Sequence, residues 1–122
     1  MNARSSLIVD GANVVGSVPD GWWRDRPGAA RRLHERLLVA DLPHEEVVLV
    51  LEGQARSGVR SGRDAHVRTV HATRDGDSEI REQARRALAR GEVVTVVTAD
   101  RALGANVSPA LVLGPSWLLD RL

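Results

Sequence analysis

The sequence predicts one α/β domain, in which helices cover both faces of a mainly parallel sheet of about five strands. Two continuous apolar runs, 47–51 and 93–98, are typical of strands buried on both faces, as the strands of a parallel sheet are. Segments with strand and helix patterns alternate along the chain, which indicates right-handed βαβ units. No change in composition marks a linker, so residues 1–122 are expected to form a single three-layer α/β/α domain.

The first third of the chain predicts one short strand and one long helix. Residues 7–9 are rich in β-branched side chains and end at Asp10 and a glycine, which predicts a buried strand and a turn. After a glycine-rich loop, a helix is expected over 27–40, because apolar side chains recur on one face and charged side chains on the other. Pro27 suits the first turn of this helix, and Asp25 suits its N-cap.

The middle of the chain predicts two strands, a loop and a second long helix. The run 47–51 is expected to be a central strand. Residues 53–65 are rich in glycine, serine and arginine, which favours a mobile loop or a loop with a short helix. Alternation over 66–72 predicts a third strand. A helical pattern over 78–90 ends before Gly91, a residue that suits the end of a helix.

The last third predicts two strands and two short helices. The run 93–98 is the expected fourth strand, and a short helix through Leu103 follows it. Residues 110–113 are expected to form a fifth, short strand. Pro115 then opens a terminal helix.

Composition excludes several kinds of chemistry. The chain has no cysteine, which excludes a disulfide scaffold, a thiolate metal site and a cysteine nucleophile. All 17 basic residues are arginine, so a Schiff-base lysine and a P-loop lysine are excluded as well. The net charge of +1 argues against a polybasic protein. The exclusive use of arginine fits a compositional bias of the genome and also fits contact with phosphates, and both explanations can hold together.

The N-terminal segment contains no apolar run long enough for a signal peptide or a membrane span, because 7–9 is the first such run. We therefore expect a cytoplasmic protein with no membrane partner.

Acidic side chains follow the predicted strands at the same end. Asp10 and Glu52 come directly after two of the apolar runs, and Asp100 comes just after a third. Asp77 lies at the start of the helix that follows the third predicted strand. The carboxyl ends of parallel strands lie at one edge of a sheet, so these four carboxylates are expected to converge there. Oxygen ligands of this kind favour hard cations, Mg²⁺ or Mn²⁺.

Each of these acids also has a purely structural interpretation. Asp10 suits a turn, Asp77 and Asp100 suit helix caps, and Glu52 suits a solvated loop. The residues alone therefore predict a divalent-cation or phosphate site at the sheet edge and nothing more specific.

Four segments, taken in order, resemble the NYN domains of the PIN-like ribonuclease superfamily, and most of all its YacP-like branch. Residues 7–16, Leu-Ile-Val-Asp-Gly-Ala-Asn-Val-Val-Gly, resemble the opening strand and its Asp-Gly-x-Asn motif. Residues 47–52 resemble the second strand, which ends in an acid. Residues 76–80 resemble the acidic helix start, and 96–100 resemble the strand that ends in Thr-Ser-Asp. The match covers roughly 7–105.

This resemblance implies a PIN-like fold and a metal-dependent endoribonuclease that acts on RNA. By position it implies that Asp10, Asp77 and Asp100 are the catalytic and metal-binding acids, with Mg²⁺ or Mn²⁺ as cofactor. It assigns Asn13 to the arrangement of the first-strand site. Glu52 corresponds to a fourth metal ligand.

Two positions depart from the family pattern. Glu52 stands where the family usually has aspartate, so its side chain reaches one methylene further. Ser78 stands where many members have a second acid, which Asp75 or Glu79 would have to replace. These departures leave open a weak or lost nuclease activity.

Two other functions therefore remain as alternatives. One is a non-catalytic RNA-binding or regulatory module that keeps the PIN-like fold around a degenerate metal site. The other is a Toprim-like domain, because Glu52 and the segment 75–77 superficially fit its acidic pattern. A Toprim-like domain would leave Asp10 and Asn13 unexplained.

Arginines gather in two segments that could hold RNA. Residues 53–74 carry five arginines against one aspartate, and 24–36 carry five against two acids. The loop 53–65 leaves the expected acidic edge, and the loop that carries Trp22 begins there, whereas the arginines of the helix 27–40 also suit its solvated face. The candidate RNA-binding residues are Arg24, Arg56, Arg60, Arg63 and Trp22, the last by stacking on a base. A solvated loop and a tryptophan packed against the protein body are the structural alternatives. A homodimer, a ribosome partner and an antitoxin partner all stay open.

Overall fold

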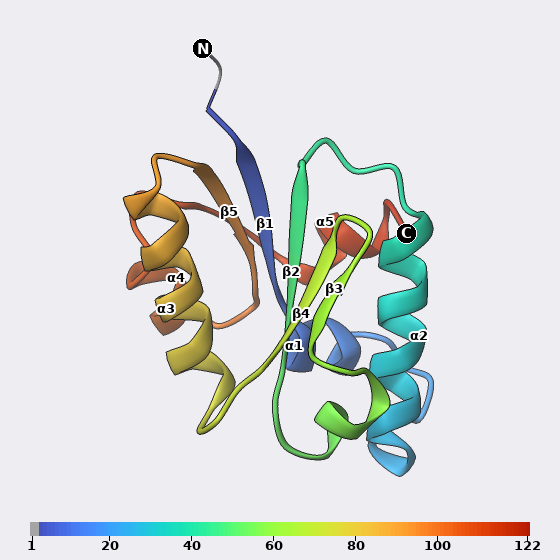
Figure 1. The fold of residues 1–122 in the computed structure, drawn as a ribbon. Coiled ribbons are helices and arrows are strands. Elements are labelled where there is room, and N and C mark those ends of the chain that lie inside the picture. The colour runs from blue at the N-terminus through green and yellow to red at the C-terminus, as the bar shows by residue number, and fades with distance from the viewer. Residues whose placement is uncertain (1–2) are drawn as a thin grey trace.

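The mainly parallel sheet predicted from the sequence is present and has six strands (Figure 1). The computed structural model describes residues 3–122. The strands are β1 (Ser5–Asp10), β2 (Glu46–Leu51), β3 (Gly62–Asp64), β4 (Val67–His71), β5 (Val93–Val97) and β6 (Leu111–Leu113). Their order across the sheet is β3-β4-β2-β1-β5-β6, and every neighbouring pair is parallel except β3 with β4.

Helices cover both faces of this sheet, as the three-layer prediction requires. They are α1 (Gly11–Gly16), α2 (Arg26–Val39), α3 (Gly76–Ala89), α4 (Arg101–Ala105) and α5 (Pro115–Leu119), with 3₁₀ turns η1 (Trp22–Arg24) and η2 (Gly53–Gly58). In Figure 1, α3 and α4 lie on one side of the sheet, and α2 and α5 lie on the other. Within residues 3–122, no helix combines the length and the apolar character that a membrane crossing requires.

The central strands supply side chains to two separate cores. Leu7 and Val9 of β1 pack in a cluster with side chains of α1, α2 and α5. Ile8, which points to the opposite face, packs with side chains of α3 and α4. In β2, Leu49 joins the first core and Val48 joins the second. Both faces of these strands are therefore buried, which explains why their sequences are continuous apolar runs.

Most predicted elements are confirmed within a few residues. The helix expected over 27–40 is α2, and the Asp25 side chain caps it by accepting a hydrogen bond from the Gly28 backbone N–H at 2.9 Å. The helix expected over 78–90 is α3, which begins two residues earlier than predicted. Gly91 follows it with a φ of 79°, a left-handed conformation that favours glycine.

Two elements differ from the prediction. The segment after Asp10 was expected to be a turn, but it forms the helix α1, because the Asp10 side chain accepts a hydrogen bond from the Asn13 backbone N–H. The segment 53–65 contains the short helix η2, one of the two alternatives expected there, but it also contains the edge strand β3, which the sequence did not predict. All three residues of β3 are exposed, so no apolar alternation marks this strand in the sequence. Its pairing is set by the free edge of β4.

The glycine of the opening motif allows helix α1 to approach strand β2 closely. A Cβ atom added at Gly11 would lie 2.6 Å from the Val50 carbonyl oxygen and 2.9 Å from Leu51 Cδ2. The first of these atoms belongs to the backbone of a central strand and cannot move aside. By contrast, a Cβ atom at Gly16 would meet only Trp22 Cζ2, at 3.8 Å.

We therefore expect Gly11→Ala to destabilise the protein by about 1–3 kcal/mol, the usual cost of an overpacked interior. Gly16→Ala, at the other end of the same helix, is the control and should leave stability unchanged or slightly raised. Urea unfolding monitored by circular dichroism measures both effects. Equal midpoints for the two variants would contradict the close approach at Gly11.

Candidate active site

The register of the central strands brings three acidic residues to one edge of the sheet. β1 lies between β2 and β5, with Val9 paired to Leu49 on one side and to Val97 on the other. Asp10 is the last residue of β1. Glu52 and Asp100 come shortly after the ends of β2 and β5. The edge predicted to carry the site is therefore the carboxyl edge, where open parallel sheets bind ligands.

Asp10 is almost fully buried, with 3% of its surface exposed. Its Oδ2 atom accepts hydrogen bonds from the Asn13 side-chain amide at 2.7 Å and from the Thr98 hydroxyl at 2.8 Å. Its Oδ1 atom accepts from the Asn13 backbone N–H at 3.3 Å. Burial raises the pKa of Asp10 more than these three hydrogen bonds lower it, and the charge of Glu52 adds to the increase.

Asn13 and Thr98 connect the ends of β1 and β5. The Asn13 Oδ1 atom accepts a hydrogen bond from the Ala99 backbone N–H at 3.2 Å, while its amide nitrogen donates to Asp10. The Thr98 hydroxyl donates to Asp10 and accepts from the Asp100 backbone N–H at 3.1 Å. Asn13 therefore lies where it can orient the Asp10 carboxylate, the position that the sequence resemblance implies. Thr98 was not among the predicted site residues, although its position at the end of an apolar run, two residues before an acid, could have indicated it.

Asp77 and Asp100 form a carboxyl pair at this edge. The pKa of Asp77 is raised by burial first, then by the charge of Asp100 and a hydrogen bond with it, and further by the charges of Asp10 and Asp75. The pKa of Asp100 is lowered, mainly because its carboxylate accepts a hydrogen bond from the Leu103 backbone N–H at 3.0 Å as the N-cap of α4. Three of the four predicted acids are therefore within electrostatic reach of one another.

Glu52 has a structural partner. Its Oε2 atom accepts a hydrogen bond from the Gly76 backbone N–H at 2.7 Å, at the start of α3. A Cβ atom at position 76 would lie 3.2 Å from the same carboxyl group, so this glycine keeps room for the longer side chain. Glu52 thereby joins the end of β2 to α3, in addition to raising the pKa of Asp10.

The residues around Ser78 form a helix cap. Asp75 accepts hydrogen bonds from the Ser78 backbone N–H at 2.7 Å and from its hydroxyl at 3.0 Å. Glu79 accepts a hydrogen bond from the Gln83 side chain at 3.0 Å. Asp75 and Glu79, which would have to stand in for the acid that position 78 lacks, are therefore both engaged in hydrogen bonds at the start of α3.

The carboxylates do not form a ready-made metal centre. In the part of the chain that the structure describes, no three His, Asp or Glu side chains are arranged to hold a metal ion. The chemistry of the donor set still suits a hard cation, because all candidate ligands are oxygens. The raised pKa values of Asp10 and Asp77 indicate negative charge that lacks full compensation. Asp77 and Asp100, beside Asp10, are the residues that could hold such an ion.

The predicted RNA-binding arginines lie in different places. Arg56 folds back onto its own segment, with its guanidinium donating to the carbonyls of Gly53 at 3.1 Å and Ala72 at 3.4 Å. Arg60 is exposed between η2 and β3. Arg63 belongs to β3 and forms an ion pair of 3.1 Å with Glu46, the first residue of β2. Arg63 therefore lies toward the opposite edge of the sheet and not beside the acids.

A cavity of about 370 Å³ lies beside the carboxyl edge. Trp22, Arg26, Gln54 and Arg74 contribute to its wall, and Glu52 borders it as well. The Arg26 guanidinium lies 5.0 Å from the centre of the Trp22 ring. The cavity thus combines an aromatic wall with two arginines at the border of the acidic site.

The adjacent Trp23 and the candidate Arg24 lie outside this wall. The Trp23 side chain is 55% exposed and contacts Trp22 edge to face, at 6.0 Å between ring centroids. Arg24 stacks over Trp23 at 5.7 Å. Of the predicted RNA-binding residues, Trp22 is therefore the one that lines the cavity.

Comparison with known proteins shows that the fold of this chain is similar to that of a solved structure. No protein-family model and no curated protein matches the sequence. Among solved structures, the chain is similar to the crystal structure of a variant of Rae1 (YacP) from Bacillus subtilis, with a TM-score of 0.70 and 18% sequence identity. The alignment covers 96% of this chain and 74% of that chain. The chain therefore has a YacP-like fold.

The like charges around Asp77 predict a gain in stability when that charge is removed. A raised folded-state pKa means that stability is lost as pH rises from the ordinary aspartate pKa, about 4, through the folded value. We expect Asp77→Asn, in EDTA at pH 7, to be more stable than the parent by a few tenths to about 1 kcal/mol. The gain should vanish below about pH 4, where the parent carboxyl is protonated too.

Thermal unfolding at several pH values measures this difference, with Asp41→Asn as a control at an exposed acid. A parent protein that is more stable than Asp77→Asn at neutral pH would show that the acids do not repel one another.

Proposed function

We propose that the chain is a metal-dependent endoribonuclease that hydrolyses RNA phosphodiester bonds at the carboxyl edge of its sheet. The observation that carries this proposal is the Asp77–Asp100 carboxyl pair, which lies within electrostatic reach of the buried Asp10. The resemblance of the sequence to YacP-like NYN domains agrees with it, and so does the likeness in fold to YacP.

Asp10, Asp77 and Asp100 are the residues that we assign to binding Mg²⁺ or Mn²⁺. The bound ion would lower the pKa of a water molecule and neutralise charge that develops on the phosphate. Asn13 and Thr98 hold the Asp10 carboxylate in one orientation, because each donates a hydrogen bond to its Oδ2 atom. We assign Asn13 and Thr98 to positioning.

The cavity lined by Trp22 supports single-stranded RNA as the substrate. A base that has left its stack can lie against an aromatic ring, and arginine side chains suit the adjoining phosphates. Arg26 and Arg74 line the same cavity. We therefore propose that a nucleotide next to the reacting phosphate occupies it.

A non-catalytic RNA-binding module is the second candidate, and two observations favour it. Glu52 is engaged with the N-terminus of α3, and the described residues contain no preformed group of three metal-ligating side chains. In such a module the acidic edge would serve only to arrange the ends of β1 and β5.

The nuclease proposal predicts cleavage of RNA by the purified protein in the presence of Mn²⁺ or Mg²⁺, and its loss with EDTA. Asp10→Asn and Asp77→Asn should each lower the rate at least about a hundredfold while RNA binding persists, because both remove a carboxylate from the metal-binding group. Gel analysis of a labelled RNA measures cleavage. Asp41→Asn should retain full activity.

Asp77→Asn is the more discriminating variant, because we expect it to be stable and yet inactive. Equal cleavage by the parent and both site variants would indicate a contaminating nuclease. Absence of cleavage by all of them, with RNA still bound, would support the non-catalytic module.

The cavity predicts a specific role for one of two adjacent tryptophans. Trp22→Ala should weaken binding of single-stranded RNA about five- to a hundredfold, the range for a lost stacking contact of about 1–3 kcal/mol. Trp23→Ala is the matched control and should change affinity less than about threefold, since that ring does not line the cavity. Fluorescence anisotropy with a labelled oligouridylate measures both. Equal losses would argue against base stacking in the cavity.

A further inference from the structure

A second hollow, of about 520 Å³, lies at the opposite edge of the sheet, near the amino-terminal ends of β1, β2 and β4. Five arginines from four segments of the chain line it, and we refer to them as the arginine basin: Arg4, Arg63, Arg68, Arg86 and Arg90. Of these, Arg63 is a named RNA-binding candidate from the sequence, and Arg68 lies in the same arginine-rich segment 53–74. The structure shows that Arg63 belongs to this cluster and not to the acidic edge.

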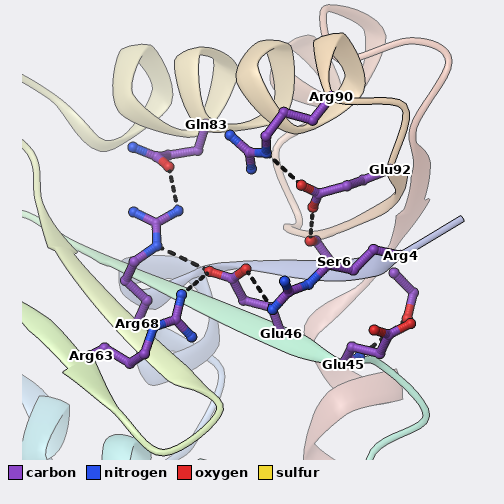
Figure 2. Close-up of polar contacts among 10 residues, drawn as sticks. Arg4, Ser6, Glu45, Glu46, Arg63, Arg68, Gln83, Arg90 and Glu92 are labelled. Atoms are coloured by element: carbon purple, nitrogen blue, oxygen red, sulfur yellow. Dashed lines mark hydrogen bonds and ion pairs between the residues drawn. The ribbon is translucent and has the colours of Figure 1, made fainter.

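A buried glutamate organises one half of the basin, as Figure 2 shows. The Glu46 side chain is 7% exposed and accepts hydrogen bonds of 3.1 Å from both Arg63 and Arg68. Arg4 lies 3.7 Å from its other carboxylate oxygen. Burial by itself would raise the pKa of Glu46, but the hydrogen bonds and charges of Arg68 and Arg63 outweigh burial and hold it below its ordinary value. Arg68 also donates to the buried Gln83 at 2.9 Å.

A second glutamate organises the other half. Glu92 accepts a hydrogen bond from Arg90 at 2.5 Å, and the Ser6 hydroxyl donates to its other carboxylate oxygen (Figure 2). Arg86 is held from outside the basin by Glu82, at 2.9 Å. All five guanidinium groups are thus orientated by carboxylates before any ligand arrives.

The lining of the basin carries a large excess of positive charge. Five guanidinium groups face only two carboxylates, and both carboxylates are buried beneath them. A guanidinium has more N–H donors than the one or two that these contacts use. The remaining donors border an open, polar hollow. Such preorganised forks suit phosphate oxygens, because the geometry is bidentate and little side-chain freedom remains to be lost.

We propose that the arginine basin binds the phosphate backbone of an RNA strand at a point distant from the acidic edge. Only the choice of RNA as the source of the phosphates rests on the proposed function. The arginines come from four segments, which suits several successive phosphates better than a single one. The length of β1, about 20 Å, separates the two edges. A strand must therefore be several nucleotides long to contact both.

The test uses two double variants that remove the same charge. Arg63→Gln/Arg86→Gln removes two arginines of the basin. Glu46 still forms ion pairs with Arg4 and Arg68, and Glu82 still forms one with Arg85, so neither glutamate loses all its partners. Arg85→Gln/Arg121→Gln removes two exposed arginines outside the basin, and Glu82 still pairs with Arg86. Both are made in the Asp10→Asn protein in EDTA, so that cleavage cannot interfere. Urea unfolding checks that both remain folded.

Binding of a fluorescein-labelled oligouridylate long enough to span both edges is measured by anisotropy across a series of NaCl concentrations. The basin variant should lose about tenfold in affinity, and its slope of log affinity against log salt should fall by about 1.4, or 0.7 for each lost phosphate contact. The control variant should stay within about twofold of the parent. A labelled dinucleotide, which is too short to contact both edges, should bind all three proteins much more weakly than the oligouridylate does.

Three other outcomes would overturn the inference. An unchanged salt slope in the basin variant would show that the basin does not contact RNA. An equal loss in both double variants would indicate non-specific attraction to charge. Binding of inorganic pyrophosphate that depends on Arg63, with no RNA bound by the parent, would assign the site to a free phosphate compound. If the parent protein binds RNA through the basin but never cleaves RNA, the nuclease proposal is wrong, and the proposal that the basin binds RNA is unaffected.

Discussion

The buried carboxylate of Asp10 is the constraint on which the acidic edge depends. It sits between two strands that are far apart in sequence, and it is satisfied only because Asn13 and Thr98 both donate to it. The same two side chains also accept hydrogen bonds, Asn13 from the Ala99 backbone N–H and Thr98 from the Asp100 backbone N–H. One desolvated acid therefore sets the start of α1, the end of β5 and the approach of Asp100. Such a group is costly to bury, and the surrounding hydrogen bonds offset that cost without removing it.

The two edges of the sheet carry opposite charge, which the small net charge of the chain does not reveal. At the carboxyl edge, burial and then the charges of Asp100 and Asp10 raise the pKa of Asp77. At the amino edge, arginines outnumber the two glutamates that orientate them. A net charge of +1 is thus an average over two separated surfaces. The arginine-rich edge suits an anionic strand, whereas the carboxylates at the other edge repel one.

Glu52 shows how one residue can serve both structure and site. Its carboxylate binds the Gly76 backbone N–H and so fixes the start of α3, the helix that carries Asp77. It also borders the cavity lined by Trp22. The extra methylene that distinguishes glutamate from the aspartate expected at this position is accommodated by a glycine at position 76. The departure from the family pattern is therefore matched by the packing around it.

Local sequence determined the strands and helices that bury apolar faces, and also which acids follow them. The runs 47–51 and 93–98 could be identified because burial on both faces leaves a continuous apolar signal. The convergence of Asp10, Asp77 and Asp100 could be predicted because parallel strands share one carboxyl edge. Only the tertiary structure decided the rest: β3 has no apolar pattern and forms against the open edge of β4.

The same reason applies to the arginines. The sequence around Arg63 does not indicate at which edge of the sheet this residue lies. The direction of β3, and so the position of Arg63, depends on the antiparallel pairing of β3 with β4. The arginine basin likewise joins residues from four distant segments around Glu46, an acid that local sequence presents as one of an ordinary Glu-Glu pair before a strand. Burial on a face is encoded locally, whereas the partners of a charged side chain are chosen by the packing of elements that lie far apart in the chain.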